Sequence, residues 1–259
     1  MLFTLQNFRR KINGEFMEEK VSGIVLSSIS YGENDKILKV FTLEKGVIST
    51  RIKGVKKAGA KLKFASEPFS FVEYVLRKGK AGFSVINASL IDSFYPLREN
   101  IFKYYAGATV LEFIKRFYQE NIVSSQAFLL AINGLKNISY GENCLGLLAQ
   151  FLICAIKESG FALLTEGCFN CGENAVKRMF FDYKSGAFYC QNCSNEDARE
   201  INPETFYTIQ KLEKGESMED IKSVKALKLI DYYLEGRMDE RLNSLKELIK
   251  MFEQVKKSG

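Results

Sequence analysis

The sequence predicts an α+β fold in which an N-terminal five-stranded OB-fold barrel is followed by an α-helical domain that carries a four-cysteine zinc module. Short alternating apolar segments fill residues 20–94, helical periodicity replaces them after Pro96, and two Cys-x-x-Cys pairs interrupt the helical part. The expected divisions are an N-terminal extension at 1–16, the OB-fold domain at 17–95, and the helical domain at 96–259 with its zinc insert at 168–193.

The barrel is predicted from five short strands that follow one another along the chain. In the third strand, Ile48 and Ile52 share one face, and Arg51 and Lys53 share the other, as the two-residue period of a half-buried strand requires. A long third connection suits an OB-fold, and an SH3-like barrel is the structural alternative. The five strands are expected at 21–30, 37–42, 47–55, 68–76 and 83–94.

The first residues look like an extension outside the barrel. Met17 is a second plausible start, and regular patterning begins only at Val21. Residues 1–16 could be an upstream start, a cloning remnant or a frayed arm. Their apolar residues precede their basic ones, the reverse of the order in a secretory signal.

The helical domain is predicted from apolar residues at helical spacing. Ser124 or Ser125 can cap the second helix, and residues 144–160 are apolar nearly all round, which indicates a central buried helix. The apolar stripe of the last helix, which includes Leu245 and Phe252, is interpreted as core. The helices are expected at 100–119, 124–138, 144–160, 202–214, 217–235 and 238–255.

The cysteine pattern predicts a structural zinc ion. Two CxxC units, CFNC and CQNC, are separated by 18 residues that include a Gly-containing turn at 184–186, which is typical of a hairpin. Four thiolates complete a tetrahedral shell and leave no open position, so the site favours structure over catalysis. The alternative is four free or redox-active thiols. The expected ligands are Cys168, Cys171, Cys190 and Cys193.

Positive charge is concentrated in the N-terminal part. Residues 1–100 hold 17 Lys/Arg and 10 Asp/Glu, whereas residues 101–259 hold 20 and 21. Between Lys45 and Lys80 there are ten basic residues and two acids, Glu67 and Glu73. Such a surface suggests nucleic acid or an anionic membrane as partner, and we favour nucleic acid. The alternative interpretation is an ordinary solvated surface.

The segment GVKKAGAK at 54–61 resembles a phosphate-binding P-loop but fails its spacing. Ala60 separates Gly59 from Lys61, and no Ser or Thr follows. We interpret it as a basic loop whose glycines and lysines can approach a sugar-phosphate backbone. Most of the aromatic residues near it should fill the barrel core, and Tyr31 is the best candidate for an exposed stacking residue.

The sequence lacks His and lacks a long apolar segment, and both facts exclude classes of protein. The chain contains no His, which excludes Ser-His-Asp and Cys-His catalysis and every His-containing metal site. The apolar run from Leu145 to Ile156 is too short to span a bilayer, and a disulfide framework is not expected in a chain of this length and pattern. We therefore expect a cytoplasmic protein that does not span a membrane and has no His-based catalysis.

Three N-terminal motifs lie within residues 22–57: YGENDKILKVFT at 31–42, EKG at 44–46 and KGVKK at 53–57. In order and spacing they resemble the N-terminal signature of the RecO family of bacterial recombination mediators, and the tract at 68–94 continues the match. The helices after Pro96 and the two CxxC pairs are similar to the C-terminal part of many members, and the similarity covers about residues 20–250.

The resemblance implies a non-enzymatic role in DNA repair, with no membrane as partner. RecO-like proteins bind single- and double-stranded DNA, anneal complementary strands and, with RecR, help to load RecA onto DNA coated by single-strand-binding protein (SSB). They also dock the acidic C-terminal tail of SSB, for which we assign no residues. The resemblance implies DNA contacts at Lys36, Lys39, Arg51, Lys53, Lys56 and Lys57. Charge alone adds Lys61, Lys63, Arg77, Lys78 and Lys80.

Two other classes of function remain as alternatives. Paired CxxC zinc modules also occur in sirtuin-like deacylases and some nucleotide kinases, but those enzymes need a Rossmann glycine motif with a catalytic His, or a P-loop. Charge and fold alone do not exclude a zinc-ribbon RNA-binding protein with an OB-type barrel. Competition between single-stranded DNA and RNA of matched sequence distinguishes it.

Overall fold

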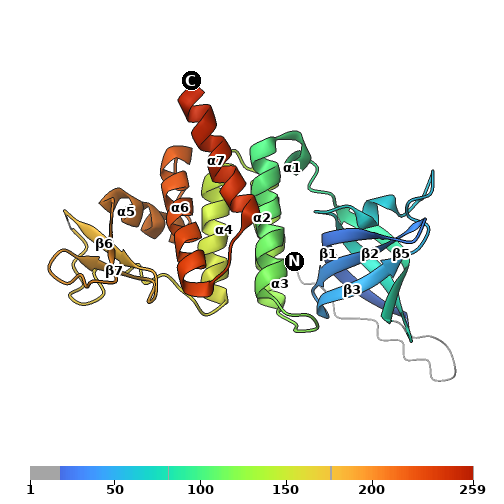
Figure 1. The fold of residues 1–259 in the computed structure, drawn as a ribbon. Helices are drawn as coiled ribbons and strands as arrows, with labels where there is room; N and C mark the ends of the chain where they lie inside the picture. Colours follow the sequence, from blue (N-terminus) through green and yellow to red (C-terminus); the bar gives the residue numbers. More distant parts are fainter. Residues whose placement is uncertain (1–17, 81, 176, 259) are drawn as a thin grey trace. The chain divides into compact units, whose positions relative to one another are not determined.

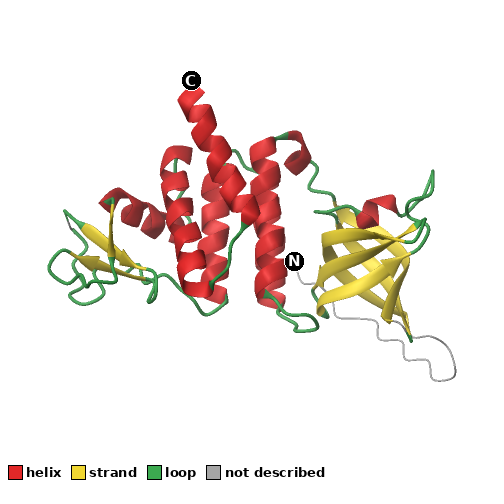
Figure 2. Cartoon of the chain, in the orientation of Figure 1, coloured by secondary structure: helices red, strands yellow, loops and turns green. Residues whose placement is uncertain are grey.

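The computed structural model describes residues 18–80, 82–175 and 177–258 of the 259. The chain divides into two compact units at Ser93 and Phe94. The first unit consists mainly of strands and the second mainly of helices (Figures 1 and 2). The predicted extension at 1–16 lies outside the described residues.

The first unit is a closed five-stranded barrel. Its strand order is β1-β2-β3-β5-β4, and β4 pairs back onto β1. The β3 and β5 strands are parallel, and all other neighbours are antiparallel. This arrangement is that of an OB-fold, so the predicted fold class is confirmed. The strands are β1 (Glu18–Tyr31), β2 (Asp35–Thr42), β3 (Gly46–Ile52), β4 (Phe71–Gly79) and β5 (Gly82–Asp92).

The barrel core follows the two-residue period of its strands. In β3, Ile48 and Ile52 are buried as predicted, while Arg51 lies on the outer face. Strands cross closely at Gly23, where an added Cβ would lie 2.5 Å from the Val40 side chain. The core therefore restricts one face of each strand to small or apolar residues and leaves the other face to solvent.

Three predicted strand boundaries are corrected by local backbone conformation. The fifth strand ends at Asp92 and not at residue 94, because Phe94 adopts positive φ (44°). The fourth strand begins at Phe71 and not at residue 68, because Phe69 has a left-handed backbone (φ 70°) and Ser70 N–H donates to Glu67 in a turn. The third strand ends at Ile52 and not at residue 55, because Gly54 also adopts positive φ (67°).

The second unit is a helical bundle. The predicted central helix is α4, whose Leu148 and Leu152 are fully buried, and it packs against α2, α3, α5 and α6 (Figure 1). Ser124 caps α3 by accepting from Ala127 N at 3.2 Å, as predicted. The helices are α1 (Pro96–Glu99), α2 (Ile101–Phe117), α3 (Ser125–Tyr140), α4 (Cys144–Glu158), α5 (Pro203–Glu213), α6 (Asp220–Met238) and α7 (Asn243–Ser258).

The last two helices are displaced along the chain from their predicted ranges. Asp239 ends α6 in a left-handed conformation (φ 51°), so α7 begins at Asn243 and not at residue 238. The predicted apolar stripe is nevertheless core, since Leu245 and Leu248 are fully buried. No helix in the described ranges is both long and apolar enough to cross a lipid bilayer.

A small sheet interrupts the helices in the order β7-β6-β8. The β6 (Met179–Asp182) and β7 (Ala187–Cys190) strands form the predicted hairpin, and the turn between them contains Gly186 with φ 72°. The third strand, β8 (Arg199–Ile201), has no counterpart in the prediction. It pairs with the outer edge of β6.

Candidate nucleic-acid interface and metal centre

Basic residues lie on the outer face of the barrel over several neighbouring strands. Ile37 of β2 lies opposite Arg51 of β3, Arg51 lies opposite Ser84 of β5, and Ser84 lies opposite Arg77 of β4. Residues opposite one another in a sheet point to the same side, so this row runs around the barrel surface. Lys39, two residues from Ile37, belongs to the same outer face.

An aromatic and apolar patch adjoins this row. Tyr31 is 48% exposed, as expected of a stacking residue, and the Arg51 guanidinium lies 4.8 Å from the centroid of its ring. Ile29 is 63% exposed and pairs with Ile37 on the same face. Ile29 and Ile37 were not among the predicted site residues. For Ile37, its alternation with the buried Leu38 was the available signal.

The basic loop between β3 and β4 is anchored by its apolar residues. Val55 and Ala65 are buried in the barrel core, and the short 3₁₀ helix η1 (Lys63–Ser66) is held where Tyr74 Oη donates to the Ala65 carbonyl at 2.7 Å. Because these apolar residues are held in the barrel core, the lysines between them face solvent. In the described part of the chain, these loop lysines are exposed and have no carboxylate within 4.0 Å: Lys53, Lys56, Lys57, Lys61 and Lys63.

Arg51 and Lys36 are predicted DNA contacts that also hydrogen-bond to other parts of the barrel. Arg51 donates to Asp35 from Nε at 2.8 Å, and Lys36 donates to Ser66 Oγ at 3.3 Å. Gly54 N–H also donates to Asp35, at 2.8 Å. These bonds hold the pKa of the Asp35 carboxyl below its usual value, and the bond from Gly54 has a larger effect than the bond from Arg51. Lys36 and Arg51 therefore contribute to the shape of the barrel whether or not they touch DNA.

The β4–β5 hairpin carries the remaining predicted basic residues. Arg77 Nη2 donates to Glu18 Oε1 at 2.7 Å, whereas Lys78 and Lys80 are exposed at the tip. The outer-face row brings Arg77 next to Ser84 and so close to Arg51. The structure thus brings the predicted residues together as a strand-borne row, a basic loop and a hairpin tip.

The four predicted metal ligands converge in the second unit. Their Sγ atoms all lie within 4.8 Å of one another, and Cys171 Sγ lies 3.8 Å from Cys190 Sγ. Zinc–sulfur bonds of about 2.3 Å in a tetrahedron require sulfur–sulfur distances of about 3.8 Å. The cluster can therefore hold a metal ion, and its geometry fits zinc. Its members are Cys168, Cys171, Cys190 and Cys193.

The protonation of the cluster reflects its crowding. Burial acts to raise the pKa of Cys168, but backbone N–H groups of Cys190, Cys171 and Asn170 outweigh it and lower that pKa to about 6. The thiols of Cys190 and Cys171 raise the pKa of Cys193 to about 12. Neighbouring thiolates repel one another, so a bound dication is what would allow all four to ionise.

The cysteine module is packed onto α5 and α6. Phe188 contacts Phe206 with ring centroids 4.8 Å apart, and Phe181 meets Tyr233 at 5.9 Å. At Gly236 an added Cβ would lie 2.4 Å from the nearest ring carbon of the module's Tyr183. The module is therefore a continuation of the helical core.

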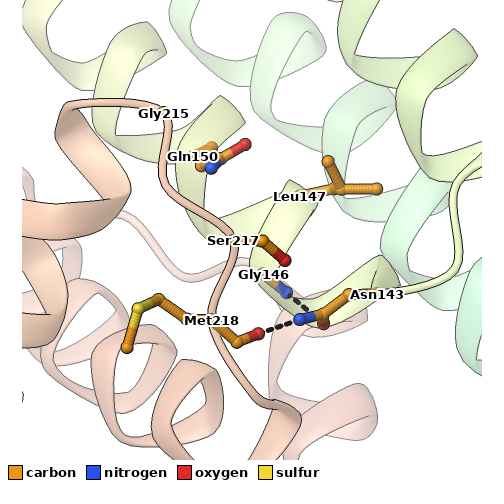
Figure 3. Close-up of a pocket in the computed structure, with 7 residues that line it drawn as sticks. All are labelled: Asn143, Gly146, Leu147, Gln150, Gly215, Ser217 and Met218. Atoms are coloured by element: carbon orange, nitrogen blue, oxygen red, sulfur yellow. Dashed lines mark hydrogen bonds between the residues drawn. The ribbon is translucent and has the colours of Figure 1, made fainter.

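Two pockets of the described residues lie among the helices. In the first, Asn143 accepts from Gly146 N–H and donates to the Met218 carbonyl, which closes the loop over α4 (Figure 3). It encloses about 90 Å³, has no ionisable lining residue, and is well below the ~300 Å³ of usual ligand pockets. The second, of about 230 Å³, includes Cys144, whose pKa burial raises to about 11. That thiol stays protonated at neutral pH and is a poor nucleophile.

Comparison with known proteins gives matches over almost the whole described chain. Residues 17–94 match the model "Recombination protein O N terminal", and residues 98–246 match "Recombination protein O C terminal". Curated relatives named "DNA repair protein RecO" include those of Acetivibrio thermocellus, 28% identical over 69% of this chain and 71% of the relative, and Caldicellulosiruptor bescii, 29% identical over 73% and 78%. The relative from Exiguobacterium sp. is 24% identical over 91% of this chain and 97% of the relative's length.

Proposed function

The chain belongs to the RecO family of recombination proteins, and we propose that it is a recombination mediator that binds single- and double-stranded DNA through its barrel. The observation that carries this proposal is the set of five exposed lysines without carboxylate partners in the described loop 53–63, beside the outer-face row of Arg51 and Arg77. Neutralising phosphates with such lysines releases counterions, which supplies sequence-independent affinity.

The patch formed by Tyr31, Ile29 and Ile37 supports contact with unpaired bases. An exposed aromatic ring can stack on any base, and isoleucine side chains offer further apolar surface. Duplex DNA keeps its bases stacked inside the helix, so it would use the lysines alone. One barrel surface can thus bind single strands through bases and phosphates, and duplex through phosphates.

Annealing follows from these two modes. A surface that neutralises phosphate repulsion lowers the electrostatic barrier between complementary strands, and a duplex product would lose the base contacts that held the single strand. We propose that the protein anneals complementary strands and, with RecR, helps to load RecA onto SSB-coated DNA. The acidic tail of SSB would dock on the helical domain.

We propose that the cysteine cluster holds one structural Zn²⁺. The sulfur spacing fits a tetrahedral shell, the four thiolates fill it, and a filled shell has no position for substrate or water. The metal would supply folding free energy to the module. Its packing on Phe206 and Tyr233 would transmit that stability to the helical bundle.

The composition of the chain and of its barrel surface supports a non-enzymatic role. His is absent from the sequence, and burial keeps the Cys144 thiol in its protonated form. The proposed working surface of the barrel carries lysines, arginines and apolar groups, which bind a polyanion through charge and base stacking.

Fluorescence anisotropy with labelled 30-mer single-stranded DNA, duplex DNA and RNA of matched sequence tests the proposal. We expect single-stranded DNA to compete at least as well as RNA, and adding RecR to increase RecA loading on SSB-coated DNA. A strong preference for RNA, with no effect on RecA loading, would instead favour an RNA-binding barrel.

A further inference from the structure

Three consecutive residues bind the two ends of the basic loop, namely Asn34 in the turn before β2 and Asp35 and Lys36 at the start of β2. The Asn34 carbonyl accepts from Lys56 N–H at 2.9 Å. Asp35 Oδ1 accepts from Gly54 N–H at 2.8 Å. Lys36 Nζ lies 3.3 Å from Ser66 Oγ at the far end of the loop and 3.6 Å from Glu67 Oε1. We call residues 34–36 the loop clamp.

Asp35 is the central member of the loop clamp. Its second oxygen accepts from Arg51 Nε at 2.8 Å and from Nη2 at 2.5 Å. Its side chain is 16% exposed, against 42% for Arg51, so the pair is partly shielded from solvent. Gly54 lies where the chain turns with φ 67°, and the Asp35 carboxylate is what holds its amide. One carboxylate therefore joins β2, the end of β3 and the first residues of the loop.

From this geometry we infer that Asp35 is a positioning residue for DNA binding. It orients the loop lysines and the Arg51 guanidinium but contributes no attraction to DNA itself. Lys36 acts in the same way, through Ser66 and Glu67, and not mainly as a phosphate contact. The inference deepens the proposed function and rests on it, because it requires that the loop bind DNA.

Whether the loss of Asp35 weakens or strengthens DNA binding distinguishes a positioning role from a purely electrostatic one. Asp35 is an acid on a surface that binds a polyanion, so charge alone predicts that removing it strengthens DNA binding. Positioning predicts the opposite, because Asp35→Asn loses the charge-assisted bonds that fix the loop. Glu33 is a matched control: it is exposed in the same turn, and no cation of the described chain lies within 4.0 Å of it.

The experiment measures single-stranded DNA affinity of the full chain and its variants by fluorescence anisotropy. We expect Asp35→Asn to weaken binding about tenfold, the equivalent of one lost charge-assisted hydrogen bond. Glu33→Gln should bind as wild type or slightly more tightly. Arg51→Lys keeps the net charge but loses the two-donor pair, so it should also weaken binding. Amide hydrogen exchange should be faster at Gly54 and Lys56 in both weakened variants.

Each outcome bears on the inference. Asp35→Asn binding as tightly as wild type, or more tightly, would overturn it, and so would unchanged amide exchange at Gly54. If Asp35→Asn fails to fold, the DNA affinity and the amide exchange of Arg51→Lys test the inference in its place. If wild type binds no DNA, the proposed function fails, whereas faster exchange at Gly54 in the variants would still support the loop clamp as a structural device.

Discussion

Replacing the five exposed loop lysines with Gln should flatten the salt dependence of DNA binding. Each single-strand phosphate neutralised contributes about 0.7 to the slope of log affinity against log salt, so five contacts contribute about 3.5. Between about 50 and about 200 mM salt, that slope corresponds to a loss of roughly 100-fold in affinity, which the variant would no longer show. The replaced residues are Lys53, Lys56, Lys57, Lys61 and Lys63.

The assay is fluorescence anisotropy of a labelled 30-mer at a series of salt concentrations. A matched control replaces five exposed lysines of the second unit with Gln and should leave the slope within about 1 of wild type. An unchanged slope in the loop variant, or an equal fall in the control, would refute the assignment of phosphate contacts to the loop. The control positions are Lys115, Lys136, Lys211, Lys214 and Lys256.

Three further predictions concern the stacking residue, the metal and the module interface. Tyr31→Ala should cost about 1–3 kcal/mol of single-strand affinity and leave duplex affinity unchanged, whereas Tyr31→Phe should bind normally; equal losses on both DNAs would argue against stacking. Cys171→Ser should abolish binding of one zinc per chain by mass spectrometry and lower the free energy of unfolding by on the order of 4 kcal/mol. DNA affinity should change little while it stays folded, and a folded variant without DNA binding would make the module a DNA contact. Gly236→Ala should lower the free energy of unfolding by about 1–3 kcal/mol in a urea titration, because its Cβ would lie 2.4 Å from Tyr183; an unchanged midpoint would mean that the module moves freely on α6.

The fold was predictable because its signals are local. Strand alternation, the change to helical spacing after Pro96 and the spacing of the cysteines are each read within a short window. Errors arose where a tertiary or backbone effect overrides the pattern. Phe69 is apolar and reads as strand, but its left-handed backbone places it in a turn. The β8 strand has only three residues and depends on pairing with β6, so no sequence period marks it.

The site was predictable in composition but not in its internal contacts. The basic residues are readable as charge, whereas the roles of Lys36 and Arg51 depend on which partners the barrel brings to them. Arg51 lies 16 residues from Asp35 in sequence, and Lys36 lies 30 residues from Ser66. In the sequence, Asp35 looks like an ordinary acidic residue of a turn. Only the pairing of β2 with β3, which brings Arg51 and Gly54 beside Asp35, shows that it holds the loop.

The most direct test of the account is annealing of complementary strands coated with SSB. We predict that wild type, with and without RecR, accelerates annealing followed by fluorescence quenching. The Cys171→Ser variant should retain this acceleration while folded, and the five-lysine loop variant should lose most of it at physiological salt. Annealing by the loop variant at the wild-type rate would contradict the claim that the basic barrel is the working surface.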